Sequence, residues 1–139
     1  MEKSYLAGLF DGEGCVLIGY RKTGNPRFLS MYISITNQDP RPLKACFQEY
    51  GGGVLTRSIR PDWPCYRWQT GSRKALRFLK DVLPWLIIKK EEAEVAIQFQ
   101  EKKKKGHKRS EEEIQVELSL REKLLLIRRQ RKISLMELK

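Results

Sequence analysis

Histidine is almost absent from this chain of 139 residues, in which His107 is the only one. A single histidine excludes sites that need several, so neither a histidine–metal cluster nor a zinc finger is expected. Cysteine is also scarce: Cys15, Cys46 and Cys65 are odd in number and lack metal-ligand spacing. We therefore expect three free, buried thiols in a reducing compartment.

Long apolar runs are missing as well. The segment from Tyr5 to Phe10 is too short for the apolar part of a signal peptide, and acidic residues follow it. No stretch reaches the roughly 20 apolar residues of a transmembrane helix. We expect an intracellular protein with no targeting segment and no membrane partner.

Acidic residues are outnumbered, because 28 Lys and Arg against 17 Asp and Glu give a net charge of +11 and a pI near 9.8. The excess is spread along the chain: residues 1–100 contribute +5 and residues 101–139 contribute +6. An extended positive surface favours a polyanionic partner, with nucleic acid ahead of membrane.

The most informative segment runs from Leu6 to Gly14 and reads LAGLFDGEG. Ser4, Gly8 and Gly12 recur every fourth residue, so on a helix they form a stripe of small groups that lets a second helix approach closely. Glu13 then lies at the tip of the helix pair, beside a two-fold axis if the partner is a second copy. Two carboxylates this close repel each other unless a cation lies between them, so the geometry predicts a metal site.

These residues resemble the signature of the LAGLIDADG homing endonucleases, with Phe10 for the isoleucine, Gly12 for the alanine and Glu13 for the second aspartate. The alternative is an amphipathic helix that happens to contain glycines, but glycine is unfavourable inside helices. The motif occurs once, and the resemblance then implies a homodimer. The predicted dimer interface comprises Ser4, Ala7, Gly8, Asp11 and Gly12.

The expected order of elements agrees with this resemblance. Strands are predicted over 15–21, 28–36, 54–60 and 65–70, and helices over 39–50, 72–83 and 89–105, with a further helical segment from residue 111. Ser72 is expected to cap the third helix. We predict an α+β protein with the α-β-β-α-β-β-α core of the LAGLIDADG fold, an antiparallel saddle-shaped sheet and extra C-terminal helices. Residues 1–105 would form the endonuclease core, and residues 106–139 a basic helical extension of the same domain.

The resemblance also implies an active site. Glu13 and the backbone carbonyl of Gly12 would hold Mg²⁺; Mn²⁺ would substitute, and Ca²⁺ would bind without efficient cleavage. Asn37, Arg41 and Lys89 would complete the catalytic group. Each has an alternative, because Asn37 also suits a turn, Arg41 an exposed surface and Lys89 a solvated helix start, with Lys90 as the nearest competitor to Lys89.

DNA reading is expected from the polar faces of the strands, because a two-stranded ribbon fits the major groove. In residues 28–36 the apolar Leu29, Met31, Ile33 and Ile35 alternate with polar or aromatic neighbours. The predicted DNA contacts are Arg21, Ser30, Tyr32, Ser34, Thr36, Thr56, Ser58, Arg60, Arg67 and Gln69. The basic residues 102–105 and 108–109 would contact phosphates or only solvent.

The resemblance therefore implies a homodimeric homing endonuclease that cuts both strands of a long pseudo-palindromic site. It also implies an intron-encoded protein, with an intein or a free-standing gene as the alternatives. The resemblance places such a protein in the cytoplasm of a bacterium, archaeon or phage-infected cell, or in the organelle that encodes it. The alternatives are a non-cleaving binder, either an intron RNA maturase or a DNA-binding regulator, and one half of a heterodimer.

Overall fold

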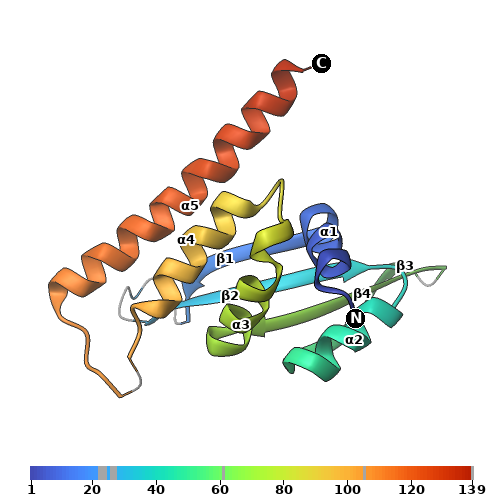
Figure 1. Ribbon diagram of the computed structural model, residues 1–139, viewed down its shortest axis with the longest axis horizontal. Helices are drawn as coiled ribbons and strands as arrows, with labels where there is room; N and C mark the ends of the chain where they lie inside the picture. Colours follow the sequence, from blue (N-terminus) through green and yellow to red (C-terminus); the bar gives the residue numbers. More distant parts are fainter. Residues whose placement is uncertain (22–24, 26–27, 61, 105, 139) are drawn as a thin grey trace.

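A four-stranded antiparallel sheet with helices on one face forms the body of the protein (Figure 1). The computed structural model describes residues 1–21, 25, 28–60, 62–104 and 106–138, with backbone alone for residues 55–60 and 63. The strand order is β1-β2-β4-β3. The elements are α1 (Lys3–Glu13), β1 (Gly14–Tyr20), β2 (Leu29–Asn37), α2 (Arg41–Tyr50), β3 (Gly53–Arg60), β4 (Trp63–Gly71), α3 (Ser72–Val82), the 3₁₀ turn η2 (Leu83–Trp85), α4 (Lys90–Glu101) and α5 (Glu111–Glu137).

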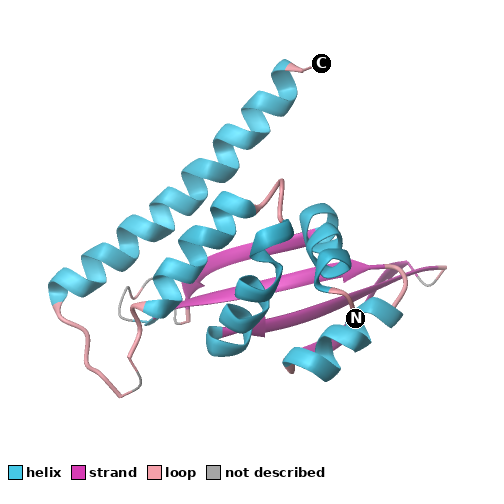
Figure 2. Cartoon of the chain, viewed as in Figure 1, coloured by secondary structure: helices cyan, strands magenta, loops and turns pink. Residues whose placement is uncertain are grey.

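This arrangement confirms the predicted α+β class and the α-β-β-α-β-β-α order. Figure 2 shows the helices on the same side of the sheet, so the other side of the sheet stays open in the described part of the chain. Residues 22–27, which connect the first two predicted strands, lie almost entirely outside the described residues. The division into a core and an extension at residue 106 remains a prediction.

The first helix packs into the core through Leu6, Ala7 and Phe10, none of which retains solvent exposure. It ends because Gly14 takes up extended backbone and its N–H donates to the Phe10 carbonyl. A Cβ at Gly14 would lie 2.2 Å from the Phe10 ring, so only glycine allows the chain to turn here from α1 into β1.

The two faces of the sheet follow from strand alternation. Leu29, Met31, Ile33 and Ile35 are buried beneath the helices, as predicted. In β4 the buried Trp68 packs against Phe78 with ring centroids 5.2 Å apart, and its indole Nε1 donates to the Gly51 carbonyl at 2.8 Å. The alternate residues of β2 and β4 therefore face the open side.

Helix starts differ from the prediction in two places. The cap of α3 is Gly71, and Ser72 is the first residue of the helix with φ of 53°, so Ser72 does not cap it. Helix α2 begins at Arg41 after Pro40, and the Asp39 carboxylate accepts the Arg41 N–H at 2.9 Å. Asp39 thus accepts a hydrogen bond from the first residue of α2, although it lies one position before the N-cap residue, Pro40.

The last helix runs alongside α4 and extends past the rest of the molecule at its C-terminal end (Figure 1). It starts with a capping box, in which Ser110 accepts the Glu113 N–H and the Glu113 carboxylate accepts the Ser110 N–H. Its buried residues are Ile114, Glu117, Leu120 and Leu124. No described helix combines the length and apolar character needed to cross a membrane.

The three cysteines are free, as predicted, but only Cys46 is buried. Burial raises the pKa of the Cys46 thiol to about 11, so this group remains a neutral core residue. Cys15 and Cys65 are half-buried on the open side of the sheet, because they occupy strand positions that alternate with the core-facing residues.

Candidate functional site

Glu13 lies at the junction of α1 and the open face of the sheet. It is the last residue of the helix, is exposed, and lines a hollow of about 200 Å³. The other residues of this hollow come from β1, β2 and β4: Cys15, Leu17, Tyr32, Ile33, Ser34, Thr36, Arg67 and Gln69. A carboxylate is therefore placed at one end of the polar sheet surface.

A second hollow brings Glu13 together with Asn37 at the end of β2. It is also lined by Thr36, Gln38 and Cys65. The Asn37 side-chain oxygen accepts the Asp39 N–H at 2.9 Å, so Asn37 also makes the turn suggested as its alternative role. Sequence analysis missed Gln38 and Cys65 as neighbours of Glu13, although Gln38 directly follows Asn37.

Asp11, two residues before Glu13, has a different environment. Its carboxylate is buried and accepts three backbone N–H groups, from Ile87 at 2.8 Å, Ile88 at 3.2 Å and Lys89 at 3.0 Å. These groups lead into α4, where a carboxylate stabilises the helix N-terminus. Asp11 therefore fixes α4 against the end of α1.

Lys89 is buried, and its side chain points toward the end of α1 at Asp11. Its ammonium donates to the Asp11 carbonyl at 2.5 Å. Burial lowers the pKa of Lys89, and the nearby Arg131 guanidinium lowers it further, while Asp11, Cys15 and Glu13 oppose the shift. Lys89 is thus held at the end of α1 that carries Glu13, whereas Lys90 is exposed.

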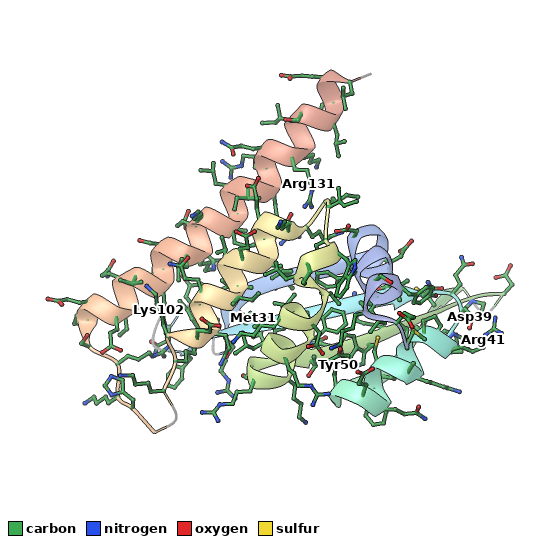
Figure 3. All side chains as sticks on the ribbon, viewed as in Figure 1. Met31, Asp39, Arg41, Tyr50, Lys102 and Arg131 are labelled. Carbon is green, nitrogen blue, oxygen red and sulfur yellow. The ribbon has the colours of Figure 1, made fainter. Side chains whose placement is uncertain are left out.

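Arg41 belongs to a separate exposed pair. Its guanidinium binds the Asp39 carboxylate through Nε at 3.0 Å and Nη2 at 2.5 Å. This pairing holds the pKa of Asp39 down at about 2. Figure 3 shows both residues together at the edge of the molecule. No contact among the described residues joins Arg41 to Glu13.

Helix α5 contributes a basic group near Glu13 that the sequence did not reveal. Arg128 Nη2 lies 3.5 Å from the Cys15 sulfur, and Nη1 lies 3.4 Å from the Val16 carbonyl. Cys15 lines the hollow that contains Glu13. Because Arg128 and Cys15 are 113 residues apart, no local sequence pattern indicated this contact.

The residues predicted for the dimer interface divide into two groups. Ala7 and Asp11 are buried within the chain itself, so they offer little surface to a second chain. Ser4, Gly8 and Gly12 are exposed, and a Cβ added at either glycine meets no atom within 4 Å. Packing of the described residues therefore does not require glycine at either position.

The predicted DNA contacts lie partly on the open sheet face. The register places Ser34 opposite Gln69 and Thr36 opposite Arg67, so these four side chains share a face with Tyr32. Arg21 is exposed beyond the end of β1, and Ser30 is buried. The side chains of Thr56, Ser58 and Arg60 lie outside the described residues. The backbone register pairs Thr56 with Tyr66, whereas Arg67 is paired with Leu55. Thr56 therefore occupies a strand position that alternates with the one opposite Arg67.

The basic run after α4 is only partly free. Lys103 donates to the Leu29 carbonyl and lies 4.8 Å from the centroid of the Phe99 ring, so it is not the solvated phosphate contact that was predicted. Burial lowers the pKa of Lys103. Arg109 is paired with the buried Glu117. These partners lie outside the basic segment and were not apparent from it.

The described residues contain no group of three or more His, Cys, Asp and Glu that could hold a metal ion. Around the end of α1 the oxygen ligands that remain available are the Glu13 carboxylate and the Gly12 carbonyl, because the Phe10 carbonyl already accepts the Gly14 N–H and the Asp11 carbonyl accepts the Lys89 ammonium. Such hard oxygen ligands fit Mg²⁺ or Ca²⁺. One chain supplies a single exposed carboxylate here, so a closed metal site requires further ligands.

Comparison with solved structures identifies the fold. The homing endonuclease I-CvuI, in complex with its target in the presence of calcium, matches with a TM-score of 0.70 and 20% identity over 90% of this chain and 80% of that chain. The homing endonuclease I-TnaI matches with a TM-score of 0.62 and 18% identity over 94% and 98% of the two chains.

A third structure is about twice as long as this chain. The LAGLIDADG homing endonuclease I-GzeII, in complex with its DNA target, matches with a TM-score of 0.66 and 17% identity over 87% of this chain and 44% of that chain. Comparison with family models gives no match, and comparison with curated protein sequences gives none.

The protein thus has the LAGLIDADG homing-endonuclease fold, in agreement with the resemblance of residues 6–14. At these identities the likeness defines the architecture.

Proposed function

We propose that this protein is a site-specific double-strand DNA endonuclease that acts as a homodimer and requires a divalent metal ion. The observation that carries the proposal is the position of Glu13. Its exposed carboxylate lies at the end of the α1 face that contains Gly8 and Gly12 and at the edge of the polar sheet surface. A phosphodiester bound along the sheet would pass this carboxylate. Structural neighbours of the same fold are described in complex with DNA, which supports this reading.

The number of carboxylates at the end of α1 supports a homodimer. A chain with one exposed Glu13 needs a second acidic group for a metal site, and a second copy packed on Gly8 and Gly12 would bring its own Glu13 alongside. Glycine inside a helix costs about 1 kcal/mol relative to alanine. Since a Cβ at either glycine would meet none of the described atoms within 4 Å, close approach by another helix is the physical reason that we propose for both glycines.

Glu13 and the Gly12 carbonyl would hold the metal ion, with Mg²⁺ favoured by the all-oxygen ligand set. When bound, such an ion activates water and stabilises the leaving oxygen of a phosphodiester. Other residues of the chain would supply positive charge and orient water beside Glu13. Lys89 supplies a positive charge behind Glu13, and Asn37 and Gln38 line the adjoining hollow, where they can orient a water molecule.

The open sheet face would read the sequence of the DNA. Arg67 and Gln69 suit guanine and adenine, respectively, in the major groove, and Ser34 and Thr36 lie directly opposite them in β2. The positive charge of the whole chain would supply most of the affinity through phosphate contacts. Arg41, paired with Asp39, has a weaker claim to a catalytic role than Lys89.

The test is a cleavage selection from a plasmid library with randomised inserts. We expect Mg²⁺ to support linearisation at a defined insert, Mn²⁺ to substitute, and EDTA to abolish cutting. Ca²⁺ should support binding in a gel shift with little or no cleavage. Specific binding without cleavage in any metal would contradict the proposal and indicate a regulator or a maturase.

A further inference from the structure

A third and larger hollow lies at the far end of the sheet from Glu13. It has a volume of about 810 Å³ and is bordered by the end of β1, the start of β2, the first turn of α3 and the end of α4. Glu13 directly precedes β1, whereas Arg21 of the hollow directly follows it. Seven strand residues at about 3.4 Å each separate the two sites by roughly 24 Å.

The hollow is lined by positive side chains without a carboxylate. None of its described lining residues is acidic, and five are basic: Arg21, Arg73, Lys74, Lys103 and Lys104. Lys103 is held by the Leu29 carbonyl and forms part of the wall, while the other four are exposed. Like charges gathered in one concavity repel each other, so an anion in the hollow would relieve the repulsion.

The first turn of α3 adds backbone donors. Ser72, Arg73 and Lys74 are the first three residues of this helix and all line the hollow. Helix α3 has no side-chain cap, so its leading N–H groups lack the partner that a capping residue provides. A helix N-terminus of this kind attracts phosphate groups.

Gln100 provides an independent observation that points to a ligand. This residue of α4 lines the hollow and is only 7% exposed. Its side-chain oxygen Oε1 is buried and has no hydrogen-bond partner among the described residues. A buried acceptor without a partner costs about 1–3 kcal/mol, which a donor held in the hollow would recover.

We propose that this hollow is a phosphate site that holds the DNA backbone away from the cut. The proposal rests on the proposed function for the identity of the strand. The α3 N-terminus, Arg73 and Lys74 bind the phosphate oxygens, and Arg21 and Lys104 close the rim. A water molecule donates one hydrogen to Gln100 Oε1 and the other to the phosphate, which satisfies the buried acceptor.

The test measures DNA affinity against salt concentration, with a labelled duplex of arbitrary sequence and the full chain. Each phosphate contact contributes about 0.9 to the slope of log K against log salt. We expect Arg73→Ala and Lys74→Ala each to lower the magnitude of the slope by up to about this amount. Lys44→Ala is the matched control, because Lys44 is exposed on α2 outside the hollow and should leave the slope unchanged.

Gln100→Leu distinguishes a specific contact in the hollow from the effect of positive charge on DNA affinity, because it changes no charge. Removal of an unpaired acceptor should raise the melting temperature. We expect DNA affinity to fall severalfold with the salt slope unchanged. Equal effects of Lys44→Ala and Lys74→Ala on the slope, or unchanged affinity in Gln100→Leu, would overturn the proposal. Because these measurements involve no cleavage, an inactive protein that gave the expected slopes would refute the nuclease and leave the phosphate site standing.

Discussion

Two carboxylates in one short motif have different surroundings, and we propose that their roles differ for this reason. Asp11 is buried and saturated by three N–H donors of the segment before α4. Glu13 is exposed and faces the two hollows at the sheet edge. The spacing of two residues puts them on different sides of the helix end. We therefore assign Asp11 to the architecture of the site and Glu13 to its chemistry.

Asp11→Asn tests this assignment through stability. The amide keeps the size but loses the charge-assisted hydrogen bonds to Ile87, Ile88 and Lys89. We expect the free energy of unfolding in urea to fall by about 2 kcal/mol. Asp62→Asn, at an exposed turn, is the control and should change it by less than about 0.5 kcal/mol. An Asp11→Asn protein as stable as wild type would show that these bonds do not hold α4.

At the scale of elements, most of the fold could be predicted because its signals are local. Alternation in β2, the glycines after α2 and the spacing of residues 6–14 each depend on neighbours within one strand or turn. The position of Glu13 at the open sheet face follows directly, since β1 begins at the next residue.

Features set by distant partners could not be predicted. Glu92 belongs to the acidic first turn of α4, yet it is 1% exposed and paired with Arg131, 39 positions later on α5. Figure 3 shows Arg131 on the side of α5 next to α4. Lys103 is likewise held by the Leu29 carbonyl, 74 residues away. The contacts of a charged residue depend on packing that a local pattern does not contain.

The Glu92–Arg131 pair should fasten α5 to α4. Arg131→Met leaves a buried carboxylate without its partner, which costs about 3–5 kcal/mol. We expect chemical denaturation to show a loss of this size for the single variant. The double variant Glu92→Leu/Arg131→Met should regain most of it, because the buried charge is also gone. Additive losses in the two variants would contradict the role of this pair.

Dimerisation through the exposed face of α1 can be tested by substitutions at Gly8. Gly8→Ala adds a methyl group where the chain has open space, so an isolated protomer should gain helix stability. Gly8→Leu should prevent close approach of a second α1 and yield folded monomers. Sedimentation velocity distinguishes the states, and circular dichroism checks the fold. A Gly8→Leu protein that remained an active dimer would rule out dimerisation through this face.

At the scale of the whole molecule, the groups proposed for DNA binding lie apart from the group proposed for the chemistry. Positive charge is spread over the chain, the polar sheet surface lies between Glu13 and the basic hollow, and the candidate chemistry is confined to the end of α1. A dimer built on α1 would place two sheet surfaces side by side, with both Glu13 residues near the axis. Loss of Glu13 should therefore stop cleavage while leaving DNA affinity intact.

The most direct test of this claim is Glu13→Gln in a plasmid-cleavage assay paired with a gel-shift titration on the selected target. The substitution removes the charge while retaining nearly the same size. We predict that cleavage in Mg²⁺ is abolished and that binding is unchanged or tighter, because two negative charges near the DNA backbone are lost. Cleavage by Glu13→Gln at a rate near that of wild type would contradict the account.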